Sequence, residues 1–503
     1  MENGSFRLVA ALLPKLPLIF RVFLLHIFRL SAPAKYLDLR TAVTVSLLRS
    51  LIAPSRPISI SKTQSITLRD PGIKGRIWVS KYAAPEPPEL GVRDALLAAV
   101  HRMSRPADPP PLARTPDIVP VEAEWTGYRA AAQRESTLPE ISEKEKYAEL
   151  MKECKNPVTV LYFHGGAYYL LDPCTHRSVT KKLARLTGGR CYSVRYRLAP
   201  QNPFPAALLD ALISYLALLY PPPDAFHQPV DPRHIVFAGD RYVLLWFCQY
   251  CQSNYKMRKH QELTCLSKSA GGNLCMALLQ TILEIRRQDV DIKWFGQERN
   301  LPVPGGLALS SPWVDMTLSS ESWTRNAEFD YLPTKAAQRL DMVPPCDVWP
   351  ANPPRMSHYA DDAFLDHPLV TVSLASDWKG APPIYISAGW ELLADEQKFM
   401  ASKLYANGVD VVFEEYEAMP HCFAMVFGWL PASKRCFDGW SGFITSAAGD
   451  SATVGSRAIT VKAKTLQEVE LDFKRLTDLT EEEVKERVQG QIASHKPLPS
   501  AKL

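Results

Sequence analysis

The sequence predicts an α/β fold in which helices cover a mostly parallel central sheet. From residue 157 onward, short runs rich in β-branched residues alternate with helical stretches, which is typical of parallel strands joined by crossover helices. A composition of 46% apolar and 22% charged residues is sufficient for a large buried core. At 503 residues, the chain has room for two or three domains, or for one α/β domain with added caps.

The expected strands are short and strongly apolar, and they lie at 158–163, 190–196, 234–239, 305–311, 382–388 and 411–417. Helices are expected before and between them, at 143–153, 206–220, 274–287 and 395–408. We expect three parts: an apolar, amphipathic N-terminal segment and cap (1–115), the α/β domain (116–460) and a charged, helical tail (461–503). Within the α/β domain, residues 318–380 are rich in Pro, Trp and polar groups and are expected to form a lid-like excursion.

The N-terminal segment 8–32 is strongly apolar but is interrupted by Lys15, Arg21, His26 and Arg29. No uninterrupted run reaches the ~18 apolar residues that a membrane-spanning helix requires. Three interpretations therefore remain open: an amphipathic segment on a membrane surface or over an apolar pocket, a helix packed on the protein's own core, and a signal anchor.

The charge distribution argues against a nucleic-acid partner. The formal net charge is +5, but segment 241–268 alone carries five Lys or Arg and one Glu, so the rest of the chain is nearly neutral. Ten cysteines in a chain of this length do not indicate a disulfide framework, and most are expected to be buried thiols.

A pair of glycines follows the strand expected at 158–163. The motif reads His164-Gly165-Gly166-Ala167. Adjacent glycines leave backbone N–H groups able to point at a ligand oxygen, as an acyl-transfer site requires at its oxyanion. A plain glycine turn is the alternative interpretation.

A second motif follows at 194–210, where VRYRLAPQNPFPAALLD runs from a strand through a loop with several prolines into a helix. Together with HGGA, it resembles the hormone-sensitive-lipase-like branch of the α/β hydrolases, in which an HGGG or HGGA loop precedes YRLAPE-type and PFPAA-type segments. Gln201 stands where that family usually has Glu. The resemblance implies an α/β-hydrolase fold with a cap or lid, a serine nucleophile, and no metal or organic cofactor.

The resemblance also covers the LSSPWVDMT segment at 309–317, which is similar to the family's SPW-x-D region. Asn326 and Asp330 then open the lid-like excursion, and no chemical role is assigned to them. The chain ends are similar only loosely to fungal members with an amphipathic N-terminal cap, including steryl-acetyl-hydrolase-like proteins.

The nucleophile elbow of this family reads G-D-S-A-G-G-N, because small residues must flank the serine in so sharp a turn. Here, GD at 239–240 and SAGGN at 269–273 are separated by the 28 residues 241–268. Joining Asp240 to Ser269 would restore a complete elbow, with a strand before it and a helix after it.

Two hypotheses address segment 241–268. The first is a retained intron, because 28 codons preserve the reading frame and splicing at Arg241 and Ser269 can restore a serine codon. The second is a small zinc site, whose ligands would be Cys248, Cys251, His260 and Cys265. Their spacing matches no established closed zinc site, and the prediction is therefore that the chain binds no metal.

The remaining triad members should follow the serine in the order acid, then histidine. Glu391 and His421 each come just after an expected strand. The family usually has Asp where Glu391 stands, although Glu can also orient an imidazole. Asp395 is the alternative acid, one helical turn further on.

The resemblance assigns the catalytic roles to Ser269, Glu391 and His421. Backbone N–H groups expected to stabilise the oxyanion belong to Gly165, Gly166 and Ala270, and the residues expected to support the site are His164, Asp240 and Gly271. The partner is a small ester, and the apolar N-terminus favours a hydrophobic one. Two other classes remain open: a hydrolase-fold protein whose insertion impairs or abolishes catalysis, and a membrane-tethered scaffold.

Overall fold

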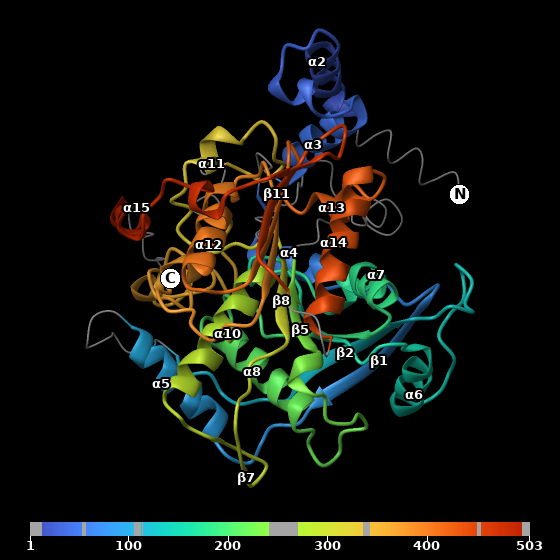
Figure 1. Cartoon of the computed structure of the whole chain (residues 1–503), viewed down its shortest axis with the longest axis vertical. Helices are drawn as coiled ribbons and strands as arrows, with labels where there is room; N and C mark the ends of the chain where they lie inside the picture. Colours follow the sequence, from blue (N-terminus) through green and yellow to red (C-terminus); the bar gives the residue numbers. More distant parts are fainter. Residues whose placement is uncertain are drawn as a thin grey trace.

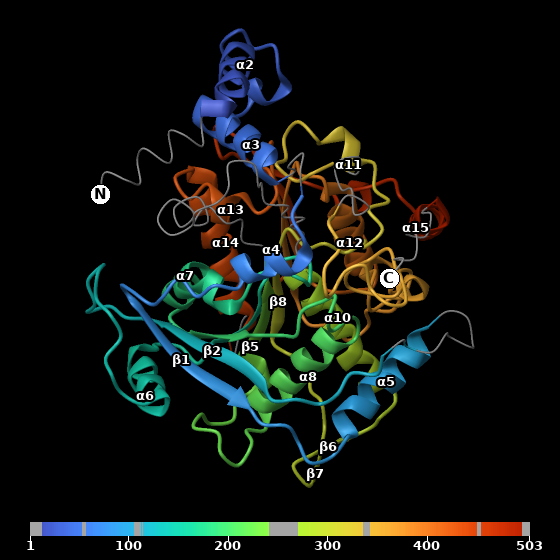
Figure 2. The same ribbon diagram turned by 180° about the vertical axis from the view of Figure 1, so that it is seen from behind.

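The computed structural model describes residues 13–52, 57–104, 112, 114–240, 270–334, 343–449 and 454–494. Its centre is a twisted ten-stranded sheet that helices cover on both faces (Figures 1 and 2). The prediction of an α/β fold with a mostly parallel sheet is confirmed.

The strand order across the sheet is β1-β2-β4-β3-β5-β8-β9-β10-β11-β12. In this order, the seven strands from β4 through β3 to β11 run parallel to one another. Strands β1 and β2 at one side and β12 at the other side pair antiparallel with their neighbours. The bounds are β1 Ile77–Ala84, β2 Val121–Tyr128, β3 Thr159–Phe163, β4 Arg190–Val194, β5 Ile235–Gly239, β8 Gly306–Ser310, β9 Ile384–Gly389, β10 Val411–Tyr416, β11 Arg457–Val461 and β12 Glu468–Glu470. A separate hairpin joins β6 Ile292–Trp294 to β7 Gln297–Arg299.

The six predicted strands are β3, β4, β5, β8, β9 and β10, which form the middle of the sheet. Five of them, β3, β4, β5, β8 and β9, are buried at every residue. Strands covered on both faces read as continuous apolar runs, which is why the sequence reveals them.

The helices of the α/β domain lie on both faces of the sheet. Helices α7 and α14 cover one face, and α8, α10 and α12 cover the other (Figures 1 and 2). The bounds are α5 Gly91–Met103, α6 Glu143–Glu153, α7 Arg177–Thr187, α8 Ala206–Leu219, α10 Ala270–Arg287, α11 Ser322–Arg325, α12 Ala394–Ala406, α13 Phe423–Val426, α14 Pro431–Ala447 and α15 Glu481–Ser494. Short 3-10 helices lie at Pro173–His176, Pro232–His234, Asp362–Phe364, Val372–Leu374 and Phe473–Arg475.

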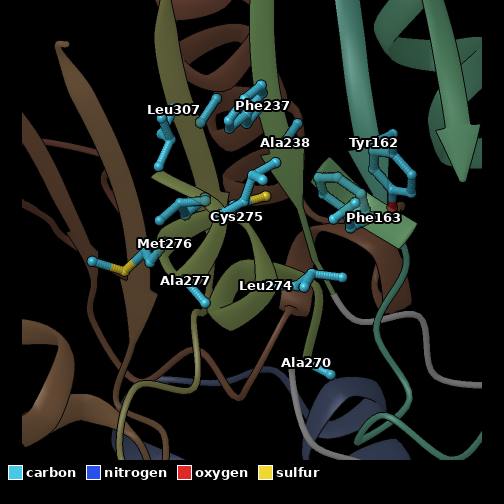
Figure 3. Close-up of a cluster of buried hydrophobic side chains, with 14 of the residues drawn as sticks. Tyr162, Phe163, Phe237, Ala238, Ala270, Leu274, Cys275, Met276, Ala277 and Leu307 are labelled. Atoms are coloured by element: carbon cyan, nitrogen blue, oxygen red, sulfur yellow. The ribbon is translucent and has the colours of Figure 1, made fainter. Parts of the chain in front are cut away.

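The four predicted helices are present as α6, α8, α10 and α12. Helix α6 begins with a capping box, in which Ser142 and Glu145 bond reciprocally to each other's backbone N–H. Helix α10 is buried along nearly its whole length, and its first turns pack against β3, β5 and β8 (Figure 3). The predicted tail helix is α15, whose Val484 and Val488 pack against Phe399.

The N-terminal region contributes more than a cap. Helices α2 Leu16–Ile27, α3 Leu39–Ile52 and α4 Ile60–Thr67 and two 3-10 turns, Leu13–Lys15 and Ala32–Lys35, precede the sheet. Strand β1 then pairs with β2, so the sheet begins inside the segment expected to be a cap, and β12 extends it past residue 460. Neither boundary at 115 or 460 therefore coincides with an edge of the sheet. Within the described residues, no helix is long and apolar enough to cross a membrane.

Candidate active site

The end of β5 and the start of α10 meet directly, although residues 241–269 separate them in the chain. A Cβ on Gly239 would lie 2.3 Å from the backbone carbon of Gly271, and a Cβ on Gly271 would lie 2.1 Å from the carbonyl oxygen of Phe163. Only glycine permits this approach of strand and helix, which is the packing required of a nucleophile elbow. Ser269, the expected nucleophile, lies outside the described residues.

The first turn of α10 is fixed by contacts with neighbouring loops. The Asn273 side chain accepts a 2.6 Å hydrogen bond from the Tyr168 hydroxyl and donates one of 3.1 Å to the carbonyl of Val370. A Cβ on Gly272 would lie 2.8 Å from Cβ of Pro312. Ala270, the expected third oxyanion donor, is the first residue of this helix and is fully buried. Asn273 stands within the SAGGN motif, but the motif alone does not indicate this anchoring role.

The His164-Gly165-Gly166 segment follows β3 and has a tightly constrained backbone. Gly166 has φ +122°, and a Cβ there would lie 2.1 Å from the carbonyl oxygen of Leu170, so the position requires glycine. Within the described chain, the N–H groups of Gly165 and Gly166 donate no hydrogen bond.

His164 anchors this loop from inside the protein. Its ring stacks on Tyr196 with centroids 4.4 Å apart, and the Tyr196 hydroxyl donates a 2.6 Å hydrogen bond to the His164 carbonyl. Burial lowers the pKa of His164 to about 4, so its ring is neutral at physiological pH. The residue supports the shape of the loop rather than supplying charge.

Glu391 and His421 form a direct contact at the carboxyl ends of two adjacent strands. Glu391 follows β9 and His421 follows β10, and Oε2 of Glu391 is hydrogen-bonded to Nδ1 of His421. Both side chains are completely buried, and Oε1 of Glu391 accepts a 3.1 Å hydrogen bond from the N–H of Gly389. Among the described residues, Nε2 of His421 has no hydrogen-bond partner. This arrangement is chemically able to hold an imidazole in one tautomer with Nε2 free to accept a proton.

Asp395, the alternative acid, is directed elsewhere. It lies on α12, where its carboxylate accepts a 2.9 Å hydrogen bond from the N–H of Ser322 and pairs with Arg325. The structure therefore brings Glu391, and not Asp395, to His421.

Asp330, for which the sequence predicts no chemical role, supports this site. Its Oδ2 accepts a 2.8 Å hydrogen bond from the N–H of Leu392, and its Oδ1 lies 3.4 Å from the backbone nitrogen of His421. Asn326 adds a 2.9 Å hydrogen bond from its side chain to the Glu391 carbonyl. Residues of the lid-like excursion thus hold together the two loops that carry the Glu391–His421 pair.

A second buried polar cluster lies behind the elbow. Asp240 is fully buried, its carboxylate accepts a hydrogen bond from the Tyr162 hydroxyl, and its Oδ1 lies 3.8 Å from Nε2 of His176. Burial raises the pKa of Asp240 to about 7, whereas it lowers the pKa of His176 to about 3. Near pH 7, His176 is therefore neutral and Asp240 is about half ionised.

The expected zinc ligands, at 248, 251, 260 and 265, all lie outside the described residues. Within the part of the chain that the structure describes, no group of three His, Cys, Asp or Glu side chains could hold a metal ion.

Relatives with known names match the region that contains this site. A family model described as an alpha/beta hydrolase fold matches residues 160–242 and 243–425, more than half of the chain, and its two parts meet inside the 241–268 segment. An acetyl-hydrolase of Streptomyces hygroscopicus is 26% identical over 294 residues, which are 58% of this chain and 77% of the relative. An esterase of Acinetobacter venetianus is 28% identical over 301 residues, 59% of this chain and 78% of the relative.

Among solved structures, the crystal structure of EstE5 soaked with p-nitrophenyl butyrate has a TM-score of 0.51 and 22% identity, and the match covers 81% of this chain and 98% of EstE5. This likeness shows a shared fold. Together with the match to the family model, it establishes that the chain belongs to the α/β hydrolase family.

Proposed function

We propose that this chain is a serine carboxylic-ester hydrolase that acts on hydrophobic acyl or acetyl esters. The observations that carry the proposal are the buried Glu391–His421 contact after β9 and β10 and the close packing of β5 against α10. The reaction class is supported by the names of the relatives, which include an acetyl-hydrolase and an esterase.

In the proposed mechanism, the Ser269 hydroxyl attacks the ester carbonyl carbon. Nε2 of His421 accepts the hydroxyl proton and returns it to the leaving alcohol, while Glu391 fixes the tautomer and stabilises the imidazolium. Water then attacks the acyl-enzyme by the same route, which releases the acid and regenerates the serine.

The negative charge that develops on the carbonyl oxygen needs donors close to the elbow. Gly165 and Gly166 supply N–H groups that donate to no described residue, and the N–H of Ala270 begins α10. Removing one such donor typically costs about 3–4 kcal/mol of barrier stabilisation. The mechanism requires neither a metal nor an organic cofactor.

The second candidate is a hydrolase-fold protein with impaired catalysis, and the 28-residue interruption at 241–268 favours it. A displacement of about 1 Å at the nucleophile can cost about a hundredfold in rate. We further propose that this segment is a retained intron, because the described elements before and after it, β5 and α10, still pack closely against each other. A dominant transcript that includes these codons would contradict the intron proposal.

The test compares the 503-residue chain with a 475-residue chain that lacks 241–268. Both are treated with a serine-reactive fluorophosphonate probe and assayed with p-nitrophenyl butyrate, with Ser269→Ala as the control. We expect strong labelling and turnover in the shorter chain, weak labelling in the longer chain and none in the variant. Absence of labelling in both chains would overturn the hydrolase proposal, whereas equal labelling would remove the argument for impairment.

A further inference from the structure

Helix α2 exposes an apolar stripe to solvent. No residue of this helix is buried, and Phe20 and Ile27 are 62% and 54% exposed. The exposed large apolar side chains of α2 recur at helical spacing. Including those just before and just after the helix, they are Leu13, Leu16, Phe20, Phe23, Leu24, Ile27, Phe28 and Leu30. A contiguous exposed stripe of this kind is unusual on a soluble protein and marks an interaction surface.

The charged residues of the segment that carries this stripe are all basic. Arg21, Arg29 and Lys35 are exposed, and the sequence from 13 to 37 contains no Asp or Glu. A segment that places basic but no acidic residues beside an apolar stripe complements an anionic lipid surface, where aliphatic and aromatic side chains enter the acyl region and cations meet the headgroups. Self-association through the same stripe would bring like charges of two copies together, which disfavours a second copy as the occupant.

The stripe is joined to the candidate active site by α3 and the turn before it. Arg49 of α3 donates hydrogen bonds of 2.9 Å and 3.0 Å to the carbonyls of Asp330 and Glu328. Tyr36 packs edge-to-face against Phe329 and against Trp390, the residue before Glu391. Both views show α2 at the end of the molecule opposite the β6–β7 hairpin and directly next to α3 (Figures 1 and 2).

We propose that α2 docks on an anionic lipid surface, with its apolar stripe inserted into the interface and its basic residues against the headgroups. Because α3 links α2 to the loops of Glu391 and His421, docking holds the site beside the lipid. The substrate class that follows is a water-insoluble ester drawn from that surface, and this second step rests on the proposed function. The docking itself does not.

The test is sedimentation of the full 503-residue chain with vesicles of phosphatidylcholine alone or of equal parts phosphatidylcholine and phosphatidylglycerol. We expect binding to the anionic vesicles that weakens with added salt. The variant Phe20→Ser/Phe23→Ser/Ile27→Ser should reduce the partition coefficient by about tenfold or more. The variant Arg21→Glu/Arg29→Glu should also reduce it by about tenfold, with less salt dependence.

The matched control is Leu90→Ser/Val290→Ser, which removes two exposed apolar side chains of similar exposure, 49% and 47%, away from α2. It should sediment like the unmodified chain. Equal sedimentation of the unmodified chain and the triple-serine variant would overturn the proposal. A concentration-dependent dimer that the triple-serine change abolishes, without vesicle binding, would also overturn it and identify a second copy as the occupant.

The link to catalysis has its own readout in the 475-residue chain. The triple-serine variant should hydrolyse soluble p-nitrophenyl acetate at the unmodified rate and lose about tenfold in rate on a long-chain ester embedded in anionic vesicles. If no chain labels with fluorophosphonate but sedimentation persists, the proposed function fails and the docking stands.

Discussion

Oδ2 of Asp330 accepts a hydrogen bond from the backbone N–H of Leu392, with 2.8 Å between the two atoms. The other carboxylate oxygen is 3.2 Å from the N–H of Leu332 and 3.4 Å from that of His421. One buried side chain from the lid-like excursion therefore ties together the loops that carry Glu391 and His421. Burial raises the pKa of Asp330, because removing its carboxyl group from water disfavours the charged form. The backbone donors hold the carboxyl group in place despite this desolvation cost.

Replacing Asp330 should disturb the relative position of Glu391 and His421 without removing either. In the 475-residue chain, we expect Asp330→Ala to lower kcat for p-nitrophenyl butyrate by about a hundredfold with little change in KM, because a misplacement of about 1 Å has that effect on rate. Asp330→Asn keeps one acceptor oxygen and should recover part of the lost rate. Equal kcat in the Ala variant and the unmodified chain would show that the contact does not position the pair.

The choice between the two acids can be decided by a matched pair of amides. Glu391→Gln removes the charge opposite Nδ1 of His421 and should reduce kcat by about 10³–10⁴-fold, as loss of the tautomer-fixing acid does in serine hydrolases. Asp395→Asn alters a carboxylate that bonds to Ser322 and Arg325, and it should change kcat less than about threefold. The opposite ranking in steady-state assays would make Asp395 the functional acid.

The elbow glycine Gly271 has no room for a side chain. Gly271→Ala would place a methyl group 2.1 Å from the carbonyl oxygen of Phe163, the last residue of β3, which should force α10 away from β3. We expect this overpacking to lower the free energy of unfolding by about 1–3 kcal/mol and to abolish esterase activity.

The matched control for Gly271→Ala is Gly442→Ala in α14. Gly442 is exposed, and a Cβ there meets no atom within 4 Å. Alanine in an open helical position should stabilise the protein by about 0.5–1 kcal/mol. Thermal melts that move the two variants in the same direction would contradict the steric reading of Gly271.

The sequence predicts best those elements whose own residues indicate that they are buried. Strand β3 is apolar and buried throughout, so its sequence identifies it directly, and Glu391 and His421 stand out because they follow such strands. The sequence does not identify strand β1, because its second half carries exposed residues between buried ones. It does not identify β12, because all residues of that strand are exposed. The sequence gives no role to Asp330, because two of the three backbone N–H groups near its carboxylate belong to loops more than 60 residues away.

Stability at mildly acidic pH should depend on buried neutral histidines. His227 packs beside Tyr82 and Trp125, and burial lowers its pKa from 6.5 to about 4. The folded chain therefore keeps this ring neutral where the unfolded chain protonates it. Its contribution is complete above pH 6.5 and is lost as the pH falls through 4. His164 and His176 act in the same direction.

Asp240 acts in the opposite direction over part of this range, because its raised pKa favours the folded state below about pH 4 and loses that contribution as the pH rises through about 7. Comparing one His227 variant with the unmodified chain removes the contributions of Asp240, His164 and His176, because both proteins share them. From pH 7 to pH 5, His227→Gln should lose less stability than the unmodified chain, by about 2 kcal/mol, since one pKa unit corresponds to about 1.4 kcal/mol. Urea-unfolding midpoints measured at both pH values test this, with His101→Gln, an exposed position on α5, as the control that should follow the unmodified chain. If His227→Gln and the unmodified chain shift in parallel, the ring does not stay neutral in the folded protein.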